Sequence, residues 1–485
     1  MKSEKLYDAI TGIDDELVKE AGAYKFKNKK RIIRNWATGI SAVAAAIVAC
    51  VVIVNTNNVK RASSYDMSQE YGAAIEESLY YDTNGSGDFY ETETEANDAI
   101  SMEKAITDFS TGETGEGYDT NSFSEKLILE VIPEENMENV VVSPVNVYMA
   151  LGMLAEITDN STRDQVINAL GADSIETVRA NAAEILRTNM KETDYLKSVL
   201  AGSIWLNDSY SYRDGITDTL KSYYDADSFM GDMSGTELLK EYRSWINQKT
   251  NGLLEDVSNG LSFDESTLAV LCTTVYFKNN WLSEFEESAN TEDIFKGSKK
   301  DKTVTYMQQA ETTSYYSGDG YTAAALSMYE GYSMLFVLPE TGVTPETLLR
   351  DEDVMSFVLT GEAKAFSKRA RVTFKVPKFD VTTNTELTKV LMNMGITDAF
   401  DPSVSDFTAL VDGNDAFAIT DAIHSARVKI DEEGCEAAAV TNIGVYGTSI
   451  EQVDDAELIL DRPFLFVIRN AENQAVFVGV VNEIK

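Results

Sequence analysis

The stretch DAIHSARVKIDEEGCEAAAVT, residues 421–441, decides the fold, because it joins a strand-forming run to a run of small side chains. The first run belongs to a longer β-rich segment and predicts a strand over 417–430. A segment that enters a packed sheet needs small side chains on its buried face and no proline. The period of two of an extended chain puts four small, uncharged residues on one face, and Glu436 and Ala438 on the other: Cys435, Ala437, Ala439 and Thr441. Taken alone, the second run also fits an alanine-rich loop or the start of a helix.

Around this stretch, helix-like and strand-like segments are unevenly distributed over residues 123–485. Apolar periodicity and capping residues predict early helices at 145–158 and 162–171. Strands predominate later, at 198–206, 268–277, 333–338, 371–380, 417–430, 463–469 and 475–481. This order favours an α+β fold over alternating βαβ units.

Several segments resemble, in the same order, segments of the serpin family. They are VVVSPVNVYMALGMLAEITDNSTRDQVINALG (140–171), INQKTNGLLEDV (246–257), VYFKNNWLSEFE (275–286), YSMLFVLPETG (332–342), RVTFKVPKFDV (371–381), the opening stretch (421–441), and DRPFLFVIRN with AVFVGVVN (461–482). Each motif alone is weak, but their number and order make the resemblance specific.

The resemblance implies a serpin domain over 122–485, with three β-sheets, eight to nine helices and an exposed reactive-centre loop. It also implies inhibition of a serine-type endopeptidase by a suicide-substrate mechanism. The protease would cut the loop, and the loop would enter the central sheet and trap the acyl-enzyme as a covalent complex. The strongly negative net charge favours a soluble monomer, and the sequence shows no catalytic constellation, so we do not expect an enzyme.

The resemblance assigns a hinge and a reactive bond to this loop. The hinge consists of Glu432, Gly434, Cys435, Glu436, Ala437, Ala438, Ala439 and Thr441. Counting from Gly434 places the reactive bond at Thr448–Ser449, with Tyr446–Gly447 as the alternative, whereas counting back from Pro463 gives Gln452–Val453. The segment 443–452 contains no Arg or Lys, which favours elastase-like or subtilisin-like targets over trypsin-like ones. Cys435 stands where the family usually has Thr or Ser, and we expect its thiol to be exposed and oxidisable before insertion.

The resemblance also places a polar cluster where the central sheet opens. Its members would be Ser143, Asn146, Thr273 and His424, with Trp281 at the top of the gap. Thr273 departs from the Asn that the family commonly carries there, so the hydrogen bonds should differ. His424 is the sole histidine of the chain, and a plain core histidine is the simpler interpretation of it.

Composition excludes several other functions. The net charge of −39 disfavours binding to the phosphates of nucleic acid. Three irregularly spaced cysteines give no disulfide framework or zinc site, and no phosphate-binding glycine loop is present. We therefore expect no cofactor, no metal site and no catalytic residues.

The N-terminal third predicts a membrane anchor. A basic run, KFKNKKRIIR (25–34), precedes the uncharged apolar run 36–54, which is long enough for a transmembrane helix. The positive-inside rule then gives a single-pass protein of the cell membrane, with a cytoplasmic tail (1–35) and an extracellular serpin domain. Residues 55–121 are acidic and poor in aliphatic residues, which predicts a flexible linker that is disordered. A cleaved signal peptide or a lipoprotein site at Cys50 is the alternative for the apolar run, and a bacterial source is expected.

Two other functions stay open at this point. The chain could be a non-inhibitory serpin-fold protein that acts as a surface binding or sensor protein, or it could inhibit papain-like cysteine proteases. Formation of an SDS-stable complex with a serine protease distinguishes inhibition from the first alternative.

Overall fold

The computed structural model describes residues 45–55, 80–81, 89–90, 119–252, 254, 263, 265–413, 416–435 and 453–484, with side chains from residue 119 onward. The predicted cytoplasmic tail, most of the predicted linker and the reactive bond lie outside these residues. Within the linker, β2 (Tyr80–Tyr81) pairs with β3 (Phe89–Tyr90). The remaining elements belong to one compact unit.

Nine α-helices lie in the described residues, which agrees with the number that the resemblance implies. They are α6 (Asn121–Val131), α7 (Pro144–Ile157), α8 (Asn160–Ala169), α9 (Ile175–Asn189), α10 (Ile216–Tyr224), α11 (Thr236–Lys249), α13 (Pro345–Leu348), α14 (Glu352–Thr360) and α15 (Thr388–Asn393), besides the short 3-10 helices η1 (Glu287–Ala289), η2 (Tyr329–Gly331) and η3 (Asp398–Phe400).

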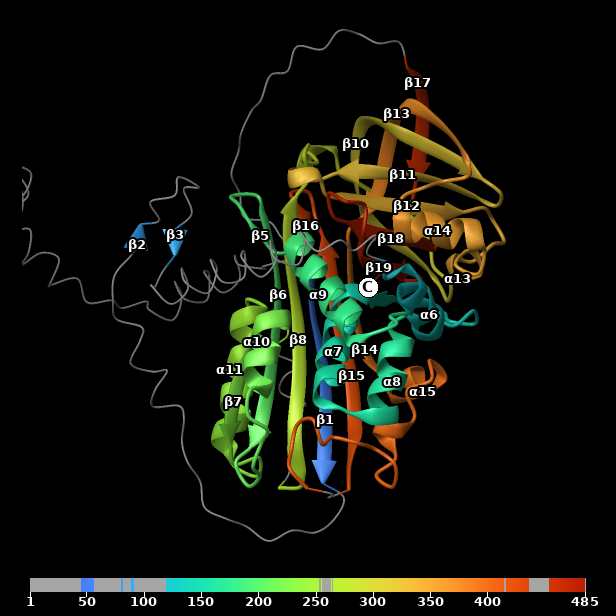
Figure 1. Cartoon of the computed structure of the whole chain (residues 1–485). Coiled ribbons are helices and arrows are strands. Elements are labelled where there is room, and N and C mark those ends of the chain that lie inside the picture. Colours follow the sequence, from blue (N-terminus) through green and yellow to red (C-terminus); the bar gives the residue numbers. More distant parts are fainter. Residues whose placement is uncertain are drawn as a thin grey trace, which may run out of the picture. The chain divides into compact units, whose positions relative to one another are not determined.

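The long strands in the lower half of Figure 1 belong to an eight-stranded sheet. Its strands, in spatial order, are β14 (Phe379–Glu386), β15 (Phe417–Ile430), β1 (Ala45–Asn55), β8 (Thr267–Asn280), β6 (Leu196–Asn207) and β5 (Lys191–Glu192), with β16 (Gly434–Cys435) beside β8 and β7 (Ala226–Gly231) beside β6. The strands β8 and β15 carry runs of β-branched and apolar residues, which favour extended backbone.

A nine-stranded sheet supplies the other two sheets of the expected three. In spatial order it contains β17 (Asp454–Ile459), β13 (Phe366–Pro377), β10 (Asp301–Gly318), β11 (Tyr321–Ser327), β12 (Ser333–Pro339), β18 (Phe464–Arg469), β19 (Ala475–Val481) and β4 (Val140–Val142), with β9 (Thr291–Lys296) beside β10. β10 pairs with β11 only over its last four residues, from Tyr315 to Gly318. This narrow junction divides the sheet into a part around β13 and a part around β18.

Helices cover both faces of the central sheet. α7 begins at Ser143, whose hydroxyl accepts the amide N–H of Asn146, and Pro144 occupies its first turn. All residues of α7 are buried, because the helix lies in the main core and contacts both β8 and β1. On the opposite face of β6 and β8, α11 contributes Tyr242 and Trp245 to a second core around Trp205.

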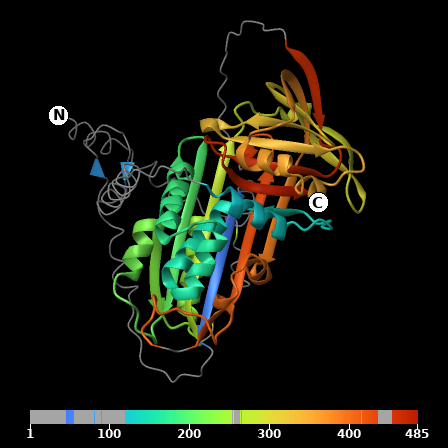
Figure 2. The ribbon, with the colours of Figure 1, turned by 45° about the vertical axis from the view of Figure 1, so that its right-hand side comes forward.

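Residues 45–54 contradict the expected transmembrane helix. They form most of the strand β1 in the structure. β1 is antiparallel to β15 on one side and to β8 on the other, and Figure 2 shows it between them from a second direction. The run contains six Val and Ile residues, and β-branched side chains favour a strand wherever a sheet offers free edges. None of the helices in the described residues is long and apolar enough to cross a bilayer.

Candidate functional site

The hinge begins as the short strand β16 at one end of β8. Gly434 pairs with Asn280 and Cys435 with Asn279, in antiparallel register. Gly434 has φ +156°, and a Cβ built there would meet the backbone oxygen of Asn279 and lie 2.7 Å from Asn280 Cα. Only glycine therefore allows the hinge to approach β8 this closely.

Cys435 is fully buried in this strand. The expectation of an exposed, oxidisable thiol was therefore wrong, because the hinge is already paired with β8 at this residue. A thiol without solvent contact behaves as a small apolar side chain. The hinge has thus entered the sheet as far as Cys435.

Trp281 fixes the approach to the hinge from the end of β8. Its backbone N–H donates to the Glu433 carbonyl and its indole N–H to the Asp431 carbonyl, both at 2.9 Å. The Phe285 N–H donates to the Glu432 carbonyl at 2.9 Å, and the Phe285 ring packs edge-on against the indole. Trp281 and Phe285, a buried aromatic pair, therefore hold the three consecutive carbonyls of residues 431–433 at the start of the hinge.

The hinge carboxylates differ in their electrostatics. Partial burial raises the pKa of Glu432, but hydrogen bonds from Lys378 and Asn290, each 2.5 Å long, outweigh it and hold the pKa below its usual range. Burial raises the pKa of both Asp431 and Glu433 above their usual values, and their mutual repulsion adds to the rise at Glu433. Hydrogen bonds therefore stabilise the ionised form of Glu432, whereas burial disfavours the ionised forms of Asp431 and Glu433.

The structure brings together the four residues predicted to lie where the sheet opens. The Ser143 N–H donates to His424 Nε2 at 3.4 Å, which joins the start of α7 to β15. Thr273 Oγ1 donates to the Asn146 carbonyl at 3.2 Å, and Asn146 Nδ2 donates to the Thr273 carbonyl at 3.5 Å. The hydroxyl of Thr273 thus reaches the start of α7 on β8, and the cluster spans the two strands that flank β1.

His424 is fully buried, and burial lowers its pKa to about 3. Its imidazole is therefore neutral at physiological pH, which allows Nε2 to accept the Ser143 N–H. Among the described residues, His424 Nδ1 and Asn146 Oδ1 have no hydrogen-bond partner. Unsatisfied buried atoms cost free energy, so this cluster is a weak point between the strands.

β1 crosses the cluster at an alanine. Ala49 lies opposite Thr273 on β8 and opposite His424 on β15. The strand β1 therefore has a small residue, Ala49, at the position that lies between Thr273 and His424. Residues 436–452, which include the remaining hinge residues and both candidate reactive bonds, lie outside the described residues.

Sequence reasoning missed three residues that hold the hinge, Asp431, Lys378 and Asn290. Asp431 and Lys378 stand inside segments that carried the family resemblance, so those motifs contained the signal. Asn290 lies in no such segment, and only the fold brings it to Glu432. Among residues 119–484 as described, no group of three His, Cys, Asp or Glu side chains could hold a metal ion.

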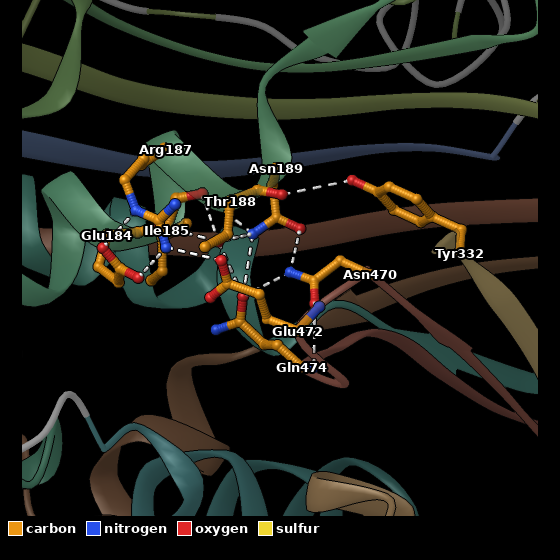
Figure 3. A network of polar contacts seen from close by, with 9 residues as sticks. All are labelled: Glu184, Ile185, Arg187, Thr188, Asn189, Tyr332, Asn470, Glu472 and Gln474. Atoms are coloured by element: carbon orange, nitrogen blue, oxygen red, sulfur yellow. Dashed lines mark hydrogen bonds and ion pairs between the residues drawn. The ribbon is translucent and has the colours of Figure 1, made fainter. Parts of the chain in front are cut away.

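A polar network fastens the end of α9 to the turn between β18 and β19 (Figure 3). Asn189 Nδ2 donates to Gln474 Oε1 at 2.9 Å, and Asn470 Nδ2 donates to Asn189 Oδ1 at 3.3 Å. Arg187 and Glu472 form an ion pair at 2.7 Å beside these amides. The C-terminal hairpin is therefore fastened to α9, a helix that lies more than two hundred residues before it in the sequence.

The geometry of β16 and β8 shows a sheet edge that accepts the start of a strand, and comparisons with known proteins identify the family that this sheet belongs to. The family model described as Serpin (serine protease inhibitor) matches residues 118–484. Human neuroserpin is 30% identical over 360 residues, which cover 71% of this chain and 86% of that protein.

Solved structures show the same fold. The thermophilic serpin tengpin in its native state superposes with a TM-score of 0.66 at 25% identity, over 76% of this chain and 94% of tengpin. A thyroxine-binding globulin complexed with thyroxine superposes with a TM-score of 0.62 at 21% identity, over 76% and 98% of the two chains. The second likeness shows the fold alone.

A chain with this sheet, hinge and length of match is a serpin-fold protein rather than an enzyme. It belongs to the serpin family.

Proposed function

We propose that this protein inhibits a serine protease as a suicide substrate. The observation that carries the proposal is β16, because Gly434–Cys435 already pairs with β8 at the point where an inserting strand has to start. The next residues, Ala437 to Ala439, are small enough to continue into a packed sheet. Strand addition of this kind supplies a new ladder of backbone hydrogen bonds on both sides.

The chemistry is that of an interrupted peptide hydrolysis. The serine of the protease attacks the carbonyl of Thr448, an ester forms, and the amine of Ser449 leaves with the proton taken from the serine. Insertion of the segment after Cys435 then carries the ester-linked protease away before water can hydrolyse the ester. Small and β-branched residues over 443–452 suit the shallow pocket of an elastase-like or subtilisin-like protease.

The test is a panel of pancreatic elastase, subtilisin, chymotrypsin and trypsin, with SDS gels and mass spectrometry of the new C-terminal fragment. We expect an SDS-stable complex with elastase or subtilisin and a fragment that begins at Ser449. A fragment beginning at Gly447 would place the bond at Tyr446. The matched control is Ala437→Glu, which puts a charge on the inserting face and should give cleavage without complex.

The alternatives give different results in the same panel. Cleavage without any complex in the unmodified chain would refute the proposal and favour a non-inhibitory binding protein. A covalent complex with papain, lost when the active-site thiol of papain is blocked, would identify cysteine proteases as the target.

The extracellular, membrane-anchored location stays a prediction from the basic run 25–34 and the apolar run 36–54. An anchor helix and β1 are alternative uses of residues 45–54, because the same backbone cannot be helical in a bilayer and paired in the sheet. Carbonate extraction of cell membranes tests the location, since only an inserted chain stays with the pellet.

A further inference from the structure

We propose that residues 45–55 form a resident strand that competes with the reactive loop for the gap between β8 and β15. This inference rests on the proposed function, because competition matters only if the loop inserts. It concerns a binding site that the sequence did not reveal: the paired edges of β8 and β15, whose occupant in this structure is a remote segment of the same chain.

The register of β16 shows that both segments would need the same edge. Cys435 lies opposite Asn279, and a continuation in this register would put Ala437 opposite Phe277. In the structure, Ala45 occupies the position opposite Phe277. β1 therefore starts where the inserting loop, counted from Gly434, would take its fourth position on β8.

The two segments match along this edge. A loop strand in the register of β16 would place Thr441 opposite Thr273, the position that Ala49 holds. Aligned on these positions, the sequence AAIVACVVIVN of β1 corresponds to AAAVTNIGVYG over 437–447. Both begin with alanines, both continue with β-branched residues, and neither contains a charge or a proline. At the position of Ala439, β1 carries the larger Ile47, so the two segments match in charge, in β-propensity and in the absence of proline rather than in side-chain volume.

The direction of β1 also corresponds to that of an inserted loop. β1 is antiparallel to β8 and to β15, and β16 is antiparallel to β8 at the same end. A strand in this orientation satisfies the facing edges of both neighbours, which would otherwise leave buried N–H and C=O groups unpaired. Since one edge cannot pair with two strands, insertion of the loop beyond Glu436 requires β1 to leave.

Covalent attachment gives β1 an advantage over a separate peptide. A segment tethered by a linker rebinds at an effective concentration on the order of millimolar, without a search through solution. The loop is tethered as well, and cleavage frees it to move. We therefore expect β1 to slow trapping of the protease and to raise the fraction of protein that is cleaved without forming a complex.

The first experiment tests whether the gap is occupied, and it uses two native cysteines. Cys50 lies directly opposite Cys272 across β1 and β8, and directly opposed residues of antiparallel strands are close enough for a disulfide. Diamide should oxidise the pair, since it accepts the two electrons and two protons that the thiols lose. We expect an intramolecular Cys50–Cys272 linkage, detected by mass spectrometry of non-reduced peptides of the full chain.

A matched variant tests the register. Cys50→Ser combined with Val51→Cys moves the thiol by one residue, opposite Leu271 instead of Cys272 and onto the other face of the strand. We expect at least a ten-fold lower yield of the linkage from this variant, and slow amide exchange over residues 45–55 in the unmodified chain. Equal yields, or rapid exchange over these residues, would overturn the inference. Recovery of the chain only in carbonate-washed membranes, with no linkage, would overturn it in favour of an anchor.

The second experiment tests competition through the yield of SDS-stable complex with elastase or subtilisin. The linked protein should be cleaved in its loop but trap no protease, and reduction should restore trapping. Ala49→Pro, which breaks the ladder at the crossing point, should form complex faster than the unmodified chain, whereas Ser64→Pro, beyond the end of β1, should not. Trapping by the linked protein at the unmodified rate would refute competition. If no form of the protein traps any protease, the proposed function fails, while the linkage experiment still decides whether β1 occupies the gap.

Discussion

Gly434→Ala tests whether the close approach of the hinge to β8 holds the first inserted residues in place. The new Cβ would lie 2.7 Å from Asn280 Cα and closer still to the Asn279 carbonyl oxygen. Both are backbone atoms, so no side chain can turn aside, and the β16 strand has to move away. Overpacking of this kind costs about 1–3 kcal/mol.

That free energy predicts a measurable change at Cys435. Because each 1.4 kcal/mol changes an equilibrium about ten-fold, the open form of the hinge should become roughly 5 to 140 times more populated. The thiol of Cys435 is fully buried in the paired hinge, so its rate of maleimide labelling should rise by the same factor. Peptide mass spectrometry distinguishes it from Cys272, which should stay protected in the sheet.

The control variant is Gly342→Ala. Gly342 also has a positive φ, of +96°, but a Cβ there meets nothing within 4 Å, and the residue lies in a turn after β12. It reproduces the conformational strain without a collision at the hinge. An unchanged Cys435 labelling rate in Gly434→Ala, or an equal rise in both variants, would refute the argument that steric contact with β8 requires glycine.

Three further predictions concern ionisable side chains in or near the core. His424 has a pKa of about 3 in the folded protein, below its usual 6.5, so its contribution to stability is complete above pH 6.5. As the pH falls toward 3, the free energy of unfolding should decrease by up to about 1.4 kcal/mol per pH unit. Urea unfolding of His424→Gln between pH 7 and 5 should lack this pH dependence, and the same dependence in the variant and the unmodified protein would contradict the prediction. Arg179→Met removes the guanidinium that donates two hydrogen bonds to the buried Glu156 carboxylate, and should lower the free energy of unfolding by about 3 kcal/mol. Adding Glu156→Gln should restore part of this free energy. An unchanged Tm of the single variant in calorimetry would contradict a stabilising role of the ion pair. Arg469 donates to the carbonyls of Phe357 and Val358 at the end of α14, so Arg469→Leu should lower unfolding free energy by about 2 kcal/mol, and an unchanged Tm would show that these bonds contribute nothing.

Much of the fold was predictable because local patterns coincide with its main elements. The expected helix 145–158 is α7 and the expected strand 417–430 is β15, with bounds that agree within a residue. Both carry strong signals: a Ser-Pro start in one case and a β-branched run in the other. Such patterns show whether a segment prefers a helix or a strand, and in these two cases the folded protein has the preferred structure.

β1 shows where local patterns fail. The run 36–54 is uncharged and long, which favours a membrane helix, but its Val and Ile content favours a strand equally well. The deciding factor is the pair of free edges on β8 and β15, which lie more than two hundred residues away in sequence. No reading of the run alone contains that information.

The polar cluster was predictable as a set of residues but not in its energetics. Family resemblance named Ser143, Asn146, Thr273 and His424, and the structure brings them together. The very low pKa of His424 arises from complete burial, which depends on every element around it. The buried state of Cys435 likewise depends on the hinge pairing with β8, which composition cannot show.

The segment after the reactive bond forms three strands that pair with parts of the molecule outside the loop. β17 pairs in parallel with β13, and β18 and β19 form inner strands between β12 and β4 with every residue buried. Severing the backbone near Thr448 would therefore give a two-chain molecule that migrates as one species on a native gel. The C-terminal fragment would separate only in denaturant. Cleaved protein would therefore be distinguished from uncleaved protein on a denaturing gel but not on a native gel.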